Sequence, residues 1–227
     1  MRLDRLVSER AGLSRRAAGI AIRGGRVDVE REVERNPRVE VAADLEFRLD
    51  GEPLVEAPRL ALFHKPLGVH SAVRDDQGRP CLGTAAAELL GLGLHPVGRL
   101  DADTDGLLLF SREGALTQHL LHPRRAIERV YVATVDPPPT ADLGERLAAG
   151  IDTADGRYVA DLRAVDGDRV TVAVTEGKHR MVRRMLANAG HPVVALRRLS
   201  YGPFVLGDLG PGAWREPTEG EWAGLRR

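Results

Sequence analysis

Apolar residues near the start of the chain recur with the period of a helix. A first helix is predicted at 3–10, with Leu3, Leu6 and Val7 on one face. A second amphipathic stretch, SRRAAGIAIRGG at 14–25, opens with a serine, which is a favoured N-cap residue. The pattern therefore predicts two short consecutive helices.

The hydrophobic pattern then changes to strict alternation. The sequence RVDVE predicts a strand at 27–29, and two further short strands are expected around 38–41 and 45–49. Two helices followed by strands within about 50 residues make a small α/β module. The stretch DGEPLVEAPR at 50–59 holds two prolines, a glycine and three acidic residues, and we expect it to be a linker.

The rest of the chain mixes predicted strands and helices without the regular alternation of a parallel α/β fold. Strands are expected at 60–65, 95–97, 107–110, 128–135, 157–165, 168–174 and 192–202. Helices are expected at 84–90, 116–121, 141–149 and 178–189. This mixture predicts an α+β fold with a mixed, mostly antiparallel sheet. The predicted domains span residues 1–57 and 58–227.

Composition narrows the class of protein. The 227 residues include one cysteine, so neither an internal disulfide nor a cysteine metal cluster is expected. No run of 18 apolar residues occurs, and the charged start MRLDRLVSER lacks the apolar stretch of a signal peptide. These features predict a cytoplasmic protein with no membrane partner, and we expect a monomer.

The net charge is zero, but basic residues cluster in two segments of the chain. Residues 1–26 carry seven arginines against Asp4 and Glu9, and residues 176–198 carry six basic residues against Glu176. Separated basic segments on a neutral chain can form a phosphate-binding surface. The alternative is that they are solvated helix faces.

The stretch DADTDG has the appearance of a metal site. Asp101, Asp103, Asp105 and Gly106 match the opening of an EF-hand calcium loop, but loop position 12 is Arg112 instead of an acidic residue. An apolar strand follows where a helix would be needed, so no metal is expected. The alternative is a polar turn in which Asp103, Thr104 and Asp105 bond backbone groups and Gly106 adopts a positive φ.

Several stretches resemble one enzyme family in a fixed order. VGRLDADTDGLLLFSREGAL resembles the signature of bacterial rRNA pseudouridine synthases of the small-subunit-rRNA-enzyme type, roughly G-R-L-D-x-x-T-x-G-L-L-x-x-T-x-[DE]-G. HKPLG, HPRRAIERVYVATV and TEGKHRMVRRM resemble further motifs of that family. The N-terminal RLDRLVSERAGLSRRAAGIAIRGGRVDVE resembles the small RNA-binding domain first described in ribosomal small-subunit protein four. Met181 and His179 depart from the family pattern, where glutamine and asparagine are common.

The resemblance implies a reaction and a set of residues for it. The family isomerises a uridine in ribosomal RNA to pseudouridine and needs no cofactor. Asp101 would be the catalytic carboxylate, Arg183 its ion-pair partner and Tyr131 the ring that stacks on a flipped-out base. Arg99 would contact the phosphate or ribose, with a local ion pair to a neighbouring aspartate as the alternative. Whether Asp101 attacks the sugar or the base, or removes a sugar proton, is left open.

The partner implied by the resemblance is ribosomal RNA, gripped by basic residues in both domains. Those expected to contact RNA are Arg2, Arg5, Arg15, Arg16, Arg23, Arg26, Lys65, Lys178, Arg180 and Arg184. For Lys65, a strand-end charge is the alternative. The competing hypothesis for the whole chain is a non-catalytic rRNA-binding or ribosome-assembly factor that keeps the fold. Which uridine and which ribosomal subunit are involved is left open.

Overall fold

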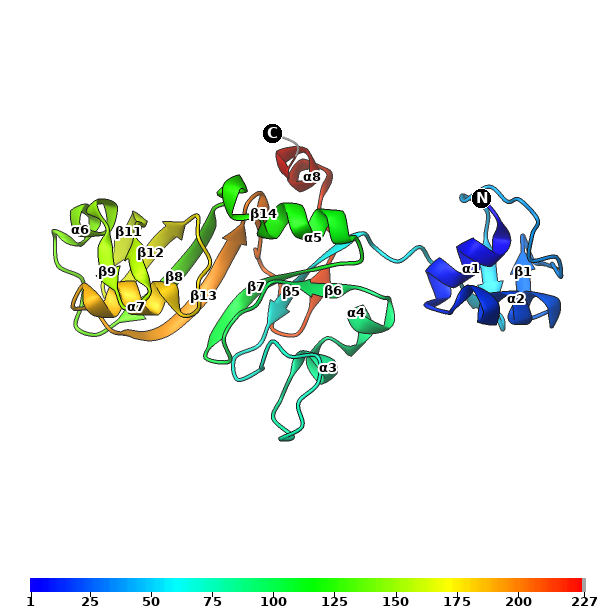
Figure 1. Cartoon of the computed structure of the whole chain (residues 1–227), viewed down its shortest axis with the longest axis horizontal. Coiled ribbons are helices and arrows are strands. Elements are labelled where there is room, and N and C mark those ends of the chain that lie inside the picture. The colour runs from blue at the N-terminus through cyan, green and yellow to red at the C-terminus, as the bar shows by residue number, and fades with distance from the viewer. Residues whose placement is uncertain (226–227) are drawn as a thin grey trace. The chain divides into compact units, whose positions relative to one another are not determined.

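A computed structural model of the chain describes residues 1–225 and divides into two compact units (Figure 1). The N-terminal unit comprises Met1–Arg59 together with Glu88–Leu94. The larger unit comprises Leu60–Ala87 and the chain from His95 onward. No helix in the described part of the chain is long and apolar enough to cross a membrane.

The N-terminal unit packs two helices on a small antiparallel sheet. The elements are α1 (Leu3–Ala11), α2 (Arg15–Arg23), β1 (Val27–Val29), β2 (Glu32–Val33), β3 (Phe47–Leu49) and β4 (Glu52–Pro53), with strand order β2-β1-β3-β4. The predicted cap of the second helix is confirmed, because the Ser14 hydroxyl accepts a hydrogen bond from the Ala17 amide at 3.2 Å. The buried core consists of Leu3, Leu6, Val7, Ala18, Ala21, Ile22, Val27 and Phe47.

Two short hairpins form the small sheet, and the segment 38–41 contributes only an isolated bridge between Glu40 and Arg2. Glu30 and Arg31 adopt left-handed φ values of 51° and 69° between β1 and β2, and Asp50 and Gly51 do the same between β3 and β4. Two consecutive residues in this conformation make the tight turn that suits a twisted antiparallel pair. The predicted strand at 38–41 is wrong, and the segment expected to be a linker begins with β4.

The larger unit is built on a nine-stranded sheet. Its main order is β11-β12-β8-β13-β7-β5-β15, with β14 on β13 and β6 on β7. The strands are β5 (Leu60–Lys65), β6 (His95–Val97), β7 (Thr104–Ser111), β8 (Arg129–Val135), β11 (Asp161–Asp166), β12 (Arg169–Val174), β13 (Val193–Tyr201), β14 (Phe204–Val205) and β15 (Trp214–Arg215). All neighbours are antiparallel except β13 and β7. The predicted α+β class with a mixed, mostly antiparallel sheet is confirmed.

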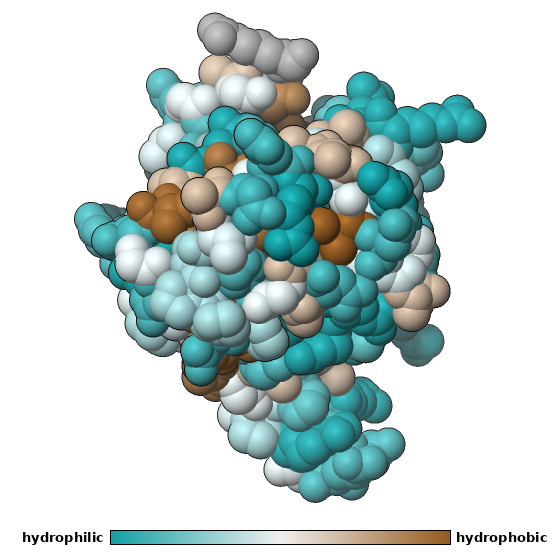
Figure 2. Space-filling model, turned by 90° about the vertical axis from the view of Figure 1, so that its left-hand side faces the viewer, coloured by the Kyte–Doolittle hydropathy of each residue, from teal (hydrophilic) through white to brown (hydrophobic). Residues whose placement is uncertain are grey.

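Helices and a separate hairpin flank this sheet. The helices are α3 (Leu82–Ala85), α4 (Ala87–Gly91), α5 (Gly114–Leu121), the 3-10 turn η1 (Pro123–Arg125), α6 (Leu143–Ala149), α7 (Met181–Asn188) and α8 (Glu219–Leu225), and the hairpin is β9 (Ile151–Thr153) with β10 (Gly156–Tyr158). Helix α7 lies beside β9 and β13 (Figure 1). The face that carries α6, α7 and the hairpin is mainly hydrophilic, with small hydrophobic patches (Figure 2).

Strand β13 brings distant parts of the chain together at the centre of the sheet. It pairs with β8 along most of its length and runs parallel to the start of β7, with Leu196 opposite Thr104 and Arg198 opposite Gly106. The start of β7 follows the DADTDG aspartates directly. The sheet therefore places that motif next to residues almost 100 positions later in the sequence.

The basic helix starts later than the sequence predicts. Arg180 has a left-handed φ of 52°, so α7 begins at Met181 and residues 178–180 form a loop ahead of it. Side-chain directions in a helix follow from the helical period. Residues 178–180 lie outside the helix, so their side chains do not follow that period.

Candidate active site

A cavity of about 360 Å³ opens in the larger unit, where four segments of the chain meet. Its walls come from residues within 97–104, 121–131, 176–182 and 196–201. That volume lies within the range of small-molecule binding sites, about 300–1,000 Å³. Asp101, Tyr131, Arg99, Lys178 and Arg180, all predicted site residues, line this cavity.

Asp101 lies in the turn that leads into β7. The turn is closed by a hydrogen bond from the Thr104 amide to the Asp101 carbonyl at 3.1 Å. The neighbouring Leu100 is fixed by Ser71, whose hydroxyl accepts from the Leu100 amide at 3.0 Å and donates to its carbonyl at 2.6 Å. The Asp101 carboxylate is about one-third exposed and lies 3.8 Å from the Arg180 guanidinium. The backbone is thus anchored on both sides, while the carboxylate faces the cavity beside a cation.

The expected ion pair between Asp101 and Arg183 is not the one the structure forms. Arg183 is buried, and its guanidinium donates to the Asp103 carbonyl at 2.5 Å and to the Val193 carbonyl at 3.1 Å. Its Nε lies 3.4 Å from the Asp103 carboxylate. Arg180, which precedes the helix, is the arginine that lies next to Asp101. Burial lowers the pKa of Arg183 from its usual value.

The second and third aspartates, Asp103 and Asp105, make ion pairs with arginines. Asp103 is held by both terminal nitrogens of Arg180, at 3.0 and 2.8 Å, and these hydrogen bonds lower the pKa of its carboxyl. Asp105 already belongs to β7 and is held by Arg197 of the adjacent strand at 2.8 and 2.7 Å. The polar-turn interpretation holds for the positive φ of Gly106 and for a backbone hydrogen bond of Asp103, but it missed these ion pairs. Asp105 pairs with Arg197 because β7 starts earlier than expected and brings the two residues opposite each other.

The inner wall of the cavity combines two tyrosines with two buried arginines. Tyr131 is 8% exposed, and the Arg198 guanidinium lies 6.0 Å from its ring centre and donates to its hydroxyl at 3.4 Å. Arg198 also lies 5.3 Å from the ring of Tyr201, and Arg129 lies 4.6 Å from the same ring. Cations over aromatic faces are attracted to the ring electrons. This wall is positively charged and aromatic, which suits a flat, electron-rich ligand.

Arg129, Arg198 and Tyr201 escaped the sequence interpretation, although a signal was present. In β8, every second residue is buried, and Arg129 occupies the same inward face as Tyr131, Ala133 and Val135. Arginine is rarely buried without a specific reason. An arginine in phase with the apolar positions of an alternating strand therefore marks a candidate site.

All six arginines predicted to contact RNA in the N-terminal unit are exposed, and four of them pair with carboxylates. Asp4 receives hydrogen bonds from both Arg2, at 2.6 Å, and Arg15, at 3.0 Å. The other two ion pairs are Arg5 with Glu9 and Arg26 with Asp50. Arg16 and Arg23 are exposed. In the larger unit, Arg184 pairs with Asp155.

Lys65 is placed differently from the prediction that it contacts RNA. Its side chain is fully buried, and the ammonium group donates to the carbonyls of Pro66 at 2.9 Å and Val69 at 2.7 Å. The reason is that β5 is an interior strand in which all six residues are buried. The RNA-contact prediction for Lys65 is therefore wrong. Burial lowers the pKa of Lys65 to about 8.

This buried lysine should make stability depend on pH in the alkaline range. An unperturbed lysine has a pKa of about 10.4. Between pH 8, the approximate folded pKa, and about 10.4, the unfolded chain binds a proton that the folded chain lacks, so the free energy of unfolding rises with pH. Denaturant titrations should show this rise in the wild type and its loss in Lys65→Met. Lys178→Met, which changes the chain's other lysine, an exposed one, is the control and should keep the rise.

Comparison with known proteins defines the class. Residues 59–188 match the family described as RNA pseudouridylate synthase. An uncharacterised RNA pseudouridine synthase of Mycobacterium tuberculosis is 40% identical over 95% of this chain and 89% of the relative. The ribosomal small subunit pseudouridine synthase A of Escherichia coli is 34% identical over 99% of this chain and 100% of the relative. A crystal structure of a pseudouridylate synthase, 29% identical, covers 99% of both chains with a TM-score of 0.68.

The match extends over more than half of the chain and is accompanied by full-length relatives. The chain therefore belongs to the RNA pseudouridylate synthase family. It is an isomerase that acts on RNA.

Proposed function

We propose that this enzyme converts a specific uridine of ribosomal RNA into pseudouridine, with Asp101 as the reacting carboxylate. The observation that carries this proposal is the cavity, in which Asp101 and Tyr131 lie with five basic side chains. The arginine and lysine side chains of its lining are Arg99, Arg129, Lys178, Arg180 and Arg198. The E. coli relative is named for small-subunit rRNA, so that RNA is the first substrate to examine.

The reaction breaks the bond between nitrogen 1 of uracil and carbon 1 of the ribose. The uracil then turns, carbon 5 bonds to the ribose, and carbon 5 loses its proton while nitrogen 1 gains one. Asp101 and Glu176 are the acidic residues among the described side chains that line the cavity. Asp101 is the better candidate, because its backbone is anchored and Arg180 at 3.8 Å complements its negative charge.

The inner wall would hold the base during this turn. A stacked uridine must leave its helix to enter a cavity, at a cost of a few kcal/mol that stacking and hydrogen bonds offset. Tyr131 offers the ring for stacking, and Arg129 and Arg198 supply positive charge where the detached uracil carries negative charge. Arg180 serves as the partner of Asp101. Arg183 donates to the carbonyl of Asp103 and so fixes the turn that carries Asp101.

The N-terminal unit would bind structured RNA as a domain of the kind first described in ribosomal small-subunit protein four. The exposed Arg16 and Arg23 on α2 are its best phosphate contacts, since Arg2, Arg5, Arg15 and Arg26 already have carboxylate partners. We assign residues 1–57 to this domain and 58–227 to the catalytic domain. A monomer acting in the cytoplasm is the simplest arrangement.

Mapping pseudouridines in rRNA tests the proposal. A strain that lacks this gene should lose one pseudouridine from its small-subunit rRNA, and a plasmid copy should restore it. Purified protein should form the same pseudouridine in an unmodified rRNA transcript without an added cofactor. A deletion strain that keeps every rRNA pseudouridine would contradict the proposal. Loss of a large-subunit site alone would keep the reaction and correct the subunit.

A further inference from the structure

A basic turn directly follows one of the segments that line the cavity. Leu121, the last residue of α5, lines the cavity and is 40% exposed. A methyl group on Gly98 would lie 3.1 Å from a Leu121 methyl, so these residues form one edge of the cavity. The turn η1 follows immediately. We call Leu121, His122, Arg124 and Arg125 the η1 rim.

The backbone of the η1 rim is fixed by its own hydrogen bonds. The His122 carbonyl accepts from the Arg125 amide at 3.0 Å, and the Pro123 carbonyl accepts from the Ala126 amide at 3.1 Å. The His122 ring nitrogen Nδ1 accepts from the Arg124 amide at 3.2 Å, which leaves the proton of a neutral ring on Nε2. A fixed turn presents its side chains with little loss of conformational entropy on binding.

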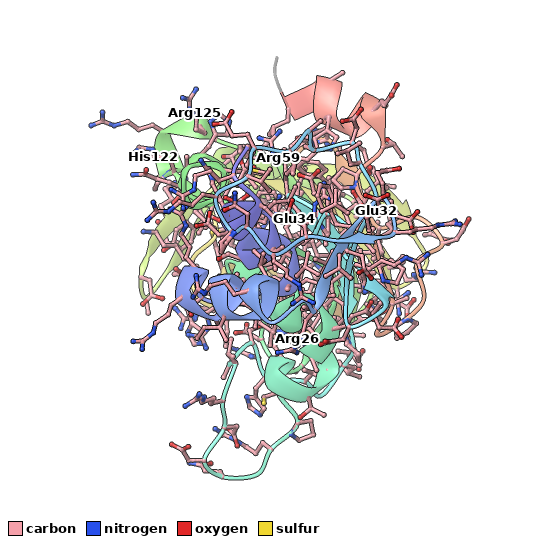
Figure 3. All side chains as sticks on the ribbon, turned by 90° about the vertical axis from the view of Figure 1, so that its right-hand side faces the viewer. Arg26, Glu32, Glu34, Arg59, His122 and Arg125 are labelled. Carbon is pink, nitrogen blue, oxygen red and sulfur yellow. The ribbon has the colours of Figure 1, made fainter. Side chains whose placement is uncertain are left out.

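The arginines of the η1 rim are charged groups without a carboxylate partner in the part of the chain that the structure describes. His122, Arg124 and Arg125 are all exposed. Arg125 projects away from the ribbon (Figure 3), whereas the His122 ring turns back to cap η1. The nearby Glu128 is already held by Arg163 at 2.6 Å, so it does not neutralise them. The positive charge here is available to an external anion.

Two basic segments thus lie at or next to the cavity. Lys178 and Arg180 of the loop before α7 line it, and so does Leu121, which the rest of the η1 rim follows directly in the chain. A nucleotide that enters the cavity carries a phosphate on each side of its ribose, and the strand must continue past both edges. We propose that Arg124 and Arg125 bind the phosphodiester backbone of the RNA strand that flanks the target uridine. This inference rests on the proposed function and adds a binding surface to it.

The salt dependence of RNA binding tests the η1 rim directly. Each phosphate contact steepens the slope of log affinity against log salt by about 0.7–0.9. Arg124→Gln combined with Arg125→Gln in the full chain should therefore reduce the slope for an unmodified small-subunit rRNA transcript by about 1.4–1.8. In steady-state assays the KM should rise about tenfold, while kcat at saturating RNA stays unchanged.

A matched double variant controls for the loss of two surface charges. Arg146→Gln with Arg169→Gln changes α6 and the start of β12, neither residue lines the cavity, and the variant should leave slope and KM unchanged. If the η1 variant keeps the wild-type slope, the proposal is overturned. Should the double variant fail to fold, each single variant should lower the slope by about 0.7–0.9. A wild-type protein that binds this RNA with the η1-dependent slope but forms no pseudouridine would refute the proposed function alone.

Discussion

Replacing Asp101 with asparagine should abolish pseudouridine formation while the protein still binds its RNA. The substitution keeps the size of the side chain and the anchored backbone of Leu100 and Thr104 but removes the reacting carboxylate. We expect the single-turnover rate to fall about a thousandfold or more. RNA affinity should be kept or slightly increased, because a negative charge near phosphate groups is lost.

The same experiment separates an enzyme from a binding factor that merely keeps the fold. Asp208→Asn, an exposed aspartate in the same unit, is the matched control and should retain full activity. Pseudouridine formation and RNA affinity are measured on the same transcript. Substantial activity in Asp101→Asn would remove this carboxylate from the reaction and direct attention to Glu176, the other acidic residue of the cavity lining in the described part of the chain.

Replacing Gly106 with alanine should unfold the larger unit or destabilise it by about 3 kcal/mol or more. Gly106 has a φ of +105°, a conformation that side chains rarely allow. An added Cβ would overlap the Arg198 carbonyl oxygen and lie 2.7 Å from the Arg198 amide nitrogen. Both atoms belong to β13, so the parallel pairing of β7 and β13 cannot accommodate the methyl group. Thermal unfolding of the full chain measures the effect.

Gly114→Ala provides the comparison for this prediction. Gly114 is the first residue of α5, and no atom outside its neighbours lies within 4 Å of an added Cβ. Alanine is favoured over glycine in helices, so this variant should be neutral or more stable by up to about 1 kcal/mol. Equal melting temperatures for Gly106→Ala and the wild type would show that the two strands separate more easily than their geometry indicates.

The hydrophobic pattern predicted the long elements of the fold and missed the short ones. The alternation in β8 and the helical spacing in α2 each bury one face, so the pattern and the structure have the same physical cause. The two-residue strands β2, β4, β14 and β15 carry too few residues to show a period. β2, β4 and β14 form short hairpins with the strand before them, so they depend on their turns, and β15 depends on β5, a partner distant in the chain.

The sequence likewise predicted which segments form the candidate site but not all contacts between their side chains. Motif order placed Asp101, Tyr131 and Arg180 in the site region, and all three line one cavity. Which arginine stands beside Asp101 depends on the left-handed residue before α7, and spacing along the chain did not reveal that conformation. Lys65 was misjudged for a related reason, since the depth of its strand in the sheet follows from the strands on either side.

The place of β13 in the sheet has a consequence for biosynthesis. β13 lies between β8 and β7, and those two strands are synthesised at least 58 residues earlier (193 − 135). Until β13 leaves the ribosome, both strands expose backbone groups that can pair with another chain. The sheet therefore closes late, through contacts distant in sequence, and such contacts form slowly. A nascent chain halted before residue 193 would carry a finished N-terminal unit beside two open strand edges.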